Sequence, residues 1–217
     1  MHDFSQSKWF AGLAARNDPE RIRLRLTLRF SLLYFIMFIM GLLLCRYTFV
    51  GRLPALRAQS EALFADPFAE CMLARDYVRT ILRAARKEMI LLAALAASGM
   101  TYVSRTASDA VLTAHALLFA GIGCHALEGL LSGAIPHPHA NLAFFLYFFA
   151  QLAQAAILLA AAVEAVYFSY EYRDAGRALR TRRDGIAAQF AWHMASYAGM
   201  LLIAQTAEAV LLTLFEK

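Results

Sequence analysis

Long apolar runs constrain this chain more than any other feature of its sequence. The longest covers residues 141–170, where Glu164 is the one side chain with a formal charge. About 20 apolar residues in a helix suffice to cross the hydrocarbon core of a bilayer, and a backbone in lipid must satisfy its hydrogen bonds internally. The sequence therefore predicts an all-α fold, a polytopic transmembrane helical bundle that forms a single membrane domain over residues 1–217.

The composition favours the same class. Hydrophobic residues make up 60% of the chain and charged residues 17%, whereas soluble domains contain about 45–50% and about 25%. The net charge of +5 comes from Lys and Arg that gather at the ends of the apolar runs, where membrane proteins need them for orientation and headgroup contact. We therefore expect contact with the lipid bilayer and no nucleic-acid partner.

The apolar runs between charged residues predict about five spans. They cover residues 30–50, 89–104, 110–131, 141–170 and 186–215. The second run is shorter than the roughly 20 residues a span needs, so we expect it to be tilted, extended by its flanks or only partly inserted. Residues 51–88 repeat apolar side chains at helical spacing and predict an extramembrane segment of amphipathic interfacial helices.

The basic residues predict an orientation in the membrane. The 171–185 connection is rich in arginine, which marks the cytoplasmic side, whereas the 132–140 connection carries no charge. Counting back through five spans places the amphipathic, basic N-terminus, residues 1–29, in the cytoplasm, and we expect the protein in a bacterial inner membrane. Residues 51–88 conflict with this orientation, because they would face outward and yet are also rich in arginine.

Polar side chains inside the predicted spans are the candidate functional residues, because burying an ionisable group in hydrocarbon is costly. The candidate intramembrane site consists of His115, His125, Glu128, His193, Gln205 and Glu208. His125 and Glu128 are three residues apart on one helix face, where they could relay protons or bind a cation. A haem between a histidine of the third span and His193 is an alternative, although no cofactor is required by the sequence.

The sequence offers little support for other chemistry. His137 and His139 are two residues apart in a short connection and would need a third ligand from elsewhere to hold a metal. Cys45, Cys71 and Cys124 form no CxxC pair, and the chain has no HExxH, GxSxG, P-loop or GxGxxG motif. We therefore expect neither a metal centre nor an enzyme.

Small residues form faces on which helix backbones can approach closely in lipid. The predicted packing face consists of Ala94, Ala97, Gly99, Gly121, Gly123, Ala156 and Ala160. It predicts helix contacts either within the chain or between subunits.

Three stretches of the chain share an order with a known family. They are a basic entry into a Gly-ending span (YVRTILRAARKEMILLAALAASGMTY, 77–102), a Gly-rich span with a Pro-His turn (ALLFAGIGCHALEGLLSGAIPHPHA, 116–140) and a closing span (GMLLIAQTAEAVLLTLF, 199–215). This order resembles the stage II sporulation protein M family of integral membrane proteins. The resemblance implies a non-catalytic component that assembles with other proteins, in that family's case a peptidoglycan-remodelling complex.

The first functional prediction is a non-enzymatic integral membrane subunit or scaffold of a larger bacterial inner-membrane complex. It would act through helix–helix docking, and its partners would be other membrane subunits or further copies of itself. One alternative is a small homo-oligomeric transporter or channel that uses the intramembrane His and Glu residues. A further alternative is a membrane redox subunit that binds haem.

Overall fold

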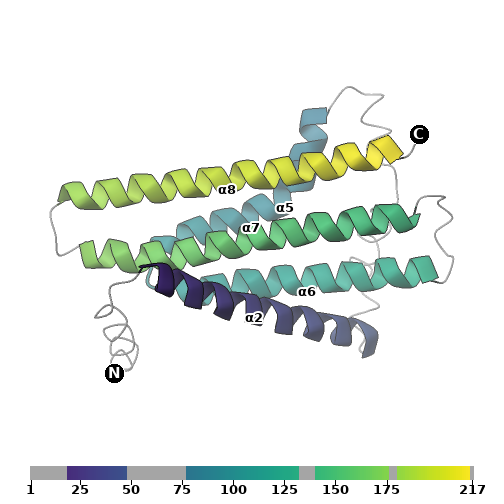
Figure 1. The fold of residues 1–217 in the computed structure, drawn as a ribbon, viewed down its shortest axis with the longest axis horizontal. Coiled ribbons are helices and arrows are strands. Elements are labelled where there is room, and N and C mark those ends of the chain that lie inside the picture. Colours follow the sequence, from purple (N-terminus) through teal and green to yellow (C-terminus); the bar gives the residue numbers. More distant parts are fainter. Residues whose placement is uncertain (1–18, 48–76, 132–139, 176–179, 216–217) are drawn as a thin grey trace.

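The computed structural model describes residues 19–47, 77–131, 140–175 and 180–215. Every regular element in these ranges is an α-helix (Figure 1), and they are α2 (Pro19–Tyr47), α5 (Tyr77–Gly99), α6 (Ser104–Leu131), α7 (Ala140–Ala175) and α8 (Arg180–Phe215). Four of them contain stretches long and apolar enough to cross a membrane, at Pro19–Tyr47, Ser104–Glu128, Phe144–Arg173 and Asp184–Ala207. The all-α prediction is confirmed, and the helices are consistent with a multi-pass membrane protein.

The first helix is longer than its apolar run predicts. It begins at Pro19 rather than at residue 30, and proline suits the first position of a helix because the missing N–H would have no helical partner there. Arginine is a good helix former, so the basic stretch that was expected to precede the first span continues the same helix. Residues 1–18 lie outside the described part of the chain.

The second predicted span differs most from the structure. α5 begins at Tyr77 and ends at Gly99, and residues 100–103 form a turn, so the helix does not continue to residue 104. Hydrogen bonds from the backbone N–H groups of Met100 and Thr101 to the carbonyls of Ala97 and Ser98 close its end. α5 is not among the four candidate spans, and the sequence of its first half includes five charged residues, Arg79, Arg83, Arg86, Lys87 and Glu88.

The helices alternate in direction along the chain. α5 and α6 are joined by the turn at residues 100–103 and run antiparallel, as α7 and α8 do (Figure 1). α2 runs parallel to α6, because Arg29 contacts Asp109 and, further along both helices, Arg46 contacts Glu128. The start of α2, the α5–α6 turn, the last residues of α7 and the first residues of α8 therefore lie at one end of the bundle, which we name the turn end.

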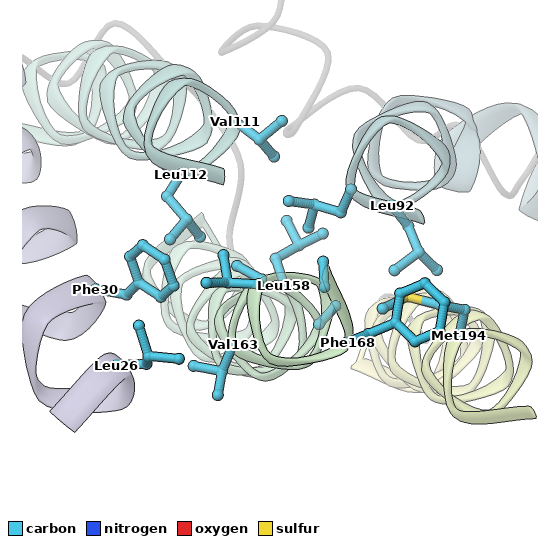
Figure 2. Close-up of a cluster of buried hydrophobic side chains, with 14 of the residues drawn as sticks. Leu26, Phe30, Leu92, Val111, Leu112, Leu158, Val163, Phe168 and Met194 are labelled. Atoms are coloured by element: carbon cyan, nitrogen blue, oxygen red, sulfur yellow. The ribbon is translucent and has the colours of Figure 1, made fainter. Parts of the chain in front are cut away.

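One buried cluster joins all five helices (Figure 2). It includes Leu26 and Phe30 of α2, Leu92 of α5, Leu112 of α6 and Leu158 of α7. On the α8 side, the rings of Phe168 and Phe190 stack with centroids 4.0 Å apart. Because lipid tails are as apolar as leucine, such contacts stabilise the bundle mainly through van der Waals packing.

The predicted packing face divides between the inside and the outside of the bundle. Gly99 and Gly121 are buried; a Cβ on Gly99 would lie 2.7 Å from the ring of Phe190, and the Gly121 carbonyl lies 3.8 Å from the Cys45 thiol. Ala160 is half-buried and a Cβ on Gly123 would meet no atom within 4 Å. The three other members are exposed and do not pack within the chain: Ala94, Ala97 and Ala156.

Candidate functional site

A layer of polar side chains crosses the interior of the bundle. The buried cluster includes one leucine in a comparable position on each of four helices, namely Leu92, Leu112, Leu158 and Leu201. Three or four residues further from the turn end, each of these helices carries a polar residue, and together these are Glu88 of α5, His115 of α6, Gln154 of α7 and Gln205 of α8. Residues spaced by three or four lie one helical turn apart on the same face. We name these four residues the polar layer.

Hydrogen bonds tie part of this layer together. The side-chain amide of Gln154 donates to Oε1 of Gln205 at 2.9 Å, and the amide of Gln151 donates to Oε1 of Gln154 at 2.9 Å. Between α2 and α6, the hydroxyl of Tyr34 lies 2.8 Å from Nδ1 of His115. The layer therefore connects α7 to α8 and α6 to α2.

Two members of the layer are buried with one polar atom unsatisfied. Glu88 is 3% exposed, and Lys87 Nζ contacts its Oε1 at 3.1 Å. The other carboxylate oxygen of Glu88 has no hydrogen-bond partner among the described residues, and neither has Nε2 of His115, which is 1% exposed. A buried polar atom without a hydrogen bond reduces stability by about 1–3 kcal/mol. A further hydrogen-bond partner at Glu88 or His115 would therefore stabilise the layer.

A second polar cluster lies nearer the turn end. Oε1 of Glu164 on α7 accepts from the guanidinium of Arg23 on α2 at 3.1 Å and lies 2.8 Å from Nδ1 of His193 on α8. The same guanidinium stacks over the Tyr167 ring, 4.4 Å from its centroid. One carboxylate thus joins three helices.

Two further ion pairs hold α2 against α6. Arg29 contacts Asp109 at 2.6 Å near the turn end, and Arg46 contacts Glu128 at 3.1 Å towards the other end. The Glu128 side chain is 49% exposed, and an exposed pair contributes only about 0–1 kcal/mol. We therefore expect the pairs nearer the turn end, Arg29–Asp109 and Arg23–Glu164, to stabilise the position of α2 more than the Arg46–Glu128 pair does.

The structure separates the residues of the predicted intramembrane site. His115 and Gln205 belong to the polar layer, and His193 belongs to the Glu164 cluster. Glu128 contacts Arg46 of α2, while Nε2 of the half-buried His125 has no hydrogen-bond partner among the described residues, so the expected His125–Glu128 contact is not seen there. The side chain of Glu208 lies outside the described part of the structure.

Sequence reasoning missed several of these groups. Neither Glu88, in the segment 51–88, nor Glu164, in the run 141–170, was among the predicted site residues. Glu88 does have a signal in the sequence, because it shares a helical face with Ala85, Leu92 and Leu95. Arg23 has no such signal, because its partner lies 141 residues away.

His115 and His193, the two histidines of the haem alternative, have different neighbours in the structure. The Nδ1 atoms of His115 and His193 each contact another side chain, and α7 lies between α6 and α8 (Figure 1). Among the described residues, no three His, Cys, Asp or Glu side chains are grouped to hold a metal ion. Cys45 and Cys124 are free thiols, and His137 and His139 lie outside the described ranges.

No protein-family model, curated protein or solved structure matches the chain. The similarity to the stage II sporulation protein M family stays a prediction.

Proposed function

We propose that this protein is a non-enzymatic integral membrane subunit that docks partner helices on one side of its bundle. One observation carries the proposal: the exposed side chains of α2 differ in size from many of those of α5 and α8. The described outer surface of α2 carries large apolar side chains, whereas α5 and α8 also expose groups of small residues beside Ile90, Trp192, Met200 and Ile203.

The outer face of α2 is typical of contact with lipid. Its exposed side chains are large and apolar, and they include Leu24, Leu28, Leu32, Phe35, Ile36, Ile39 and Leu43. Branched and aromatic side chains fill the space beside a helix and keep neighbouring backbones apart. Acyl chains suit such a face, because they need no close backbone approach.

The outer faces of α5 and α8 suit close contact with another helix. Both carry small residues at the surface, which we name the small-residue surface: the exposed Ala93, Ala94, Ala97, Ala188, Ala191 and Ala195, and the half-buried Gly199. A Cβ on Gly199 would meet no atom within 4 Å, and the nearby Trp192 is 72% exposed. Small residues at four-residue spacing let helix backbones approach closely in lipid, so this surface fits a transmembrane helix of a second subunit.

Ion pairs between the helices support a docking role for the chain. Asp109, Glu128 and Glu164 each form an ion pair with an arginine of α2. These pairs join α2 to α6 and α7. They therefore stabilise the bundle at helices other than α5 and α8, which carry the small-residue surface. A stable platform of this kind costs little ordering when a partner binds.

Docking is tested by enlarging one residue of the small-residue surface. Ala195→Leu would place a branched side chain where a partner backbone approaches. We expect the tagged variant, purified from native membranes in mild detergent, to lose most of the chains that co-purify stoichiometrically with the wild type. Ala114→Leu is the matched control, because Ala114 is also exposed but lies on α6.

Either of two results would contradict docking at this surface. One is a wild-type protein that purifies as a lone monomer. The other is an Ala195→Leu variant that retains the same partner in the same amount as Ala114→Leu does.

A second candidate function is ion transport by an oligomer of the chain. It is favoured by the polar layer, because incompletely partnered ionisable groups inside a membrane bundle are typical of ion and proton pathways. Reconstitution in liposomes with a fluorescent reporter of internal ion concentration tests it. Flux that survives alanine at Glu88, His115 and Gln205 would count against this function.

A further inference from the structure

We infer that Glu88, His115 and Tyr34 form a proton-binding relay across α5, α6 and α2. In this relay the imidazole takes up one proton from water and holds it between the Tyr34 oxygen and the Glu88 carboxylate. The site goes beyond the docking proposal and does not depend on it.

The register of the α5–α6 hairpin brings Glu88 and His115 to one depth. Glu88 precedes the last residue of α5 by 11 positions (99 minus 88), and His115 follows the first residue of α6 by 11 positions (115 minus 104). At 1.5 Å per residue, both lie roughly 16 Å from the turn along antiparallel helices. Equal depth on antiparallel helices therefore allows the two side chains to approach each other across the hairpin.

Burial places both side chains on the inner faces of their helices. Leu92 and Leu112, one helical turn nearer the turn end, belong to the same buried cluster (Figure 2). Glu88 and His115 are 3% and 1% exposed. Both polar residues are therefore buried one helical turn beyond this part of the cluster.

The unsatisfied atoms of the pair are complementary. Oε1 of Glu88 contacts Lys87, which leaves Oε2 as an acceptor, while Nδ1 of His115 contacts Tyr34, which leaves Nε2. When the Tyr34 hydroxyl donates to Nδ1, the neutral ring carries its proton on Nε2 and can donate it to Oε2 of Glu88. Both unsatisfied atoms then gain a partner.

The same arrangement accommodates one further proton. A proton taken from water binds Nδ1, and the Tyr34 hydroxyl rotates so that its oxygen accepts from Nδ1–H. The ring becomes an imidazolium between an acceptor oxygen and a carboxylate, and no hydrogen bond of the ring is lost. The net charge of the site rises by one, and the proton is the only species gained.

The charged and titratable groups around the ring are few. α5 contributes the cation of Lys87, which opposes the imidazolium, and the anion of Glu88, which favours it. α2 contributes the Tyr34 phenol, while α7 and α8 contribute the amides of Gln154 and Gln205 to this layer. A metal ion is a poorer fit than a proton, because no group of three ligating His, Cys, Asp or Glu side chains occurs in the described ranges.

The test measures the protonation of His115 directly. The full-length protein, labelled with 15N in its histidine rings, is reconstituted in lipid and titrated by solid-state NMR, and His115→Gln identifies the His115 signals. In the wild type we expect both ring nitrogens of His115 to carry protons at low pH. In Glu88→Gln, the ratio of protonated to neutral ring at a fixed pH should fall about tenfold or more, because an opposite charge within reach shifts such an equilibrium by one to three units.

Two further variants keep the test decisive. Glu128→Gln removes a carboxylate that contacts Arg46 instead, and it should leave the ratio within about twofold. Glu88→Asp retains the negative charge, so the ratio of protonated to neutral ring should fall less than in Glu88→Gln. This variant can be measured if Glu88→Gln does not fold. A ratio unchanged in both Glu88 variants, or a His115 ring that stays neutral at every pH, would overturn the relay. Ala195→Leu should leave the ratio unchanged, so that failure of the docking proposal is distinguishable from failure of this one.

Discussion

Gly41 is the position at which the α2–α6 contact is most sensitive to a single added carbon. In Gly41→Ala, the new Cβ would lie 2.7 Å from the Cβ of Ala120 and 3.3 Å from the Cα of Leu117. Since ordinary van der Waals contact begins at 3.4 Å, the helices must separate by about 0.7 Å (3.4 minus 2.7) at this point. The obstacle is backbone and a methyl group, neither of which can rotate away.

The separation is expensive because tight contacts flank Gly41 on both sides. The rings of Phe38 and Phe119 lie 5.0 Å apart on one side, and the Cys45 thiol contacts the Gly121 carbonyl at 3.8 Å on the other. A gap of 0.5–1 Å forfeits about a quarter to a half of each dispersion contact. Overpacking of this kind costs about 1–3 kcal/mol, which corresponds to a roughly 5- to 150-fold increase in the fraction of molecules in which α2 is detached.

Cys45 reports this opening, because its thiol is buried in the same interface. In a background with alanine at Cys71 and Cys124, we expect Gly41→Ala to speed labelling by a membrane-permeant maleimide by roughly 5- to 150-fold. Gly123→Ala is the matched control, because a Cβ there meets no atom within 4 Å. Equal labelling rates in the two variants would refute the reasoning.

Two further substitutions test the polar contacts. Glu164→Gln replaces the carboxylate shared by Arg23 and His193 with a neutral amide, and we expect a loss of about 1–3 kcal/mol of stability, measured by thermal unfolding in detergent. Tyr34→Phe leaves Nδ1 of His115 buried without its partner, and it should cost a similar amount, about 1–3 kcal/mol, by the same measurement.

Each substitution has a control on the same kind of residue. Glu128→Gln removes a pair whose carboxylate is 49% exposed and should change stability by less than about 1 kcal/mol. Tyr47→Phe alters a residue that is 80% exposed and should be close to neutral. If Glu164→Gln unfolds at the same temperature as Glu128→Gln, the carboxylate of Glu164 does not hold the three helices together.

Local features of the sequence determined the fold class. The length of an apolar run and the need of a backbone in lipid for internal hydrogen bonds are properties of one segment, so the helices α6, α7 and α8 could be predicted with useful bounds. The extent of α2 could not, because Arg23 and Arg29 are tolerated in the bundle through Glu164 and Asp109, which lie 141 and 80 residues away. A hydropathy value includes the free-energy cost of placing an arginine in an apolar environment, but not the stabilisation that its ion-pair partner provides.

Only the tertiary structure determined which polar residues meet. The sequence assigned Glu88 to an extramembrane segment because basic residues precede it, whereas its burial follows from the packing of α5 against the other helices. The histidines that the sequence singled out went to different places, His115 to the polar layer and His193 to Glu164, because helix order and rotation decide which faces are opposed. Burial in a bundle is a property of neighbouring helices, so no single segment of the chain contains the information that would predict it.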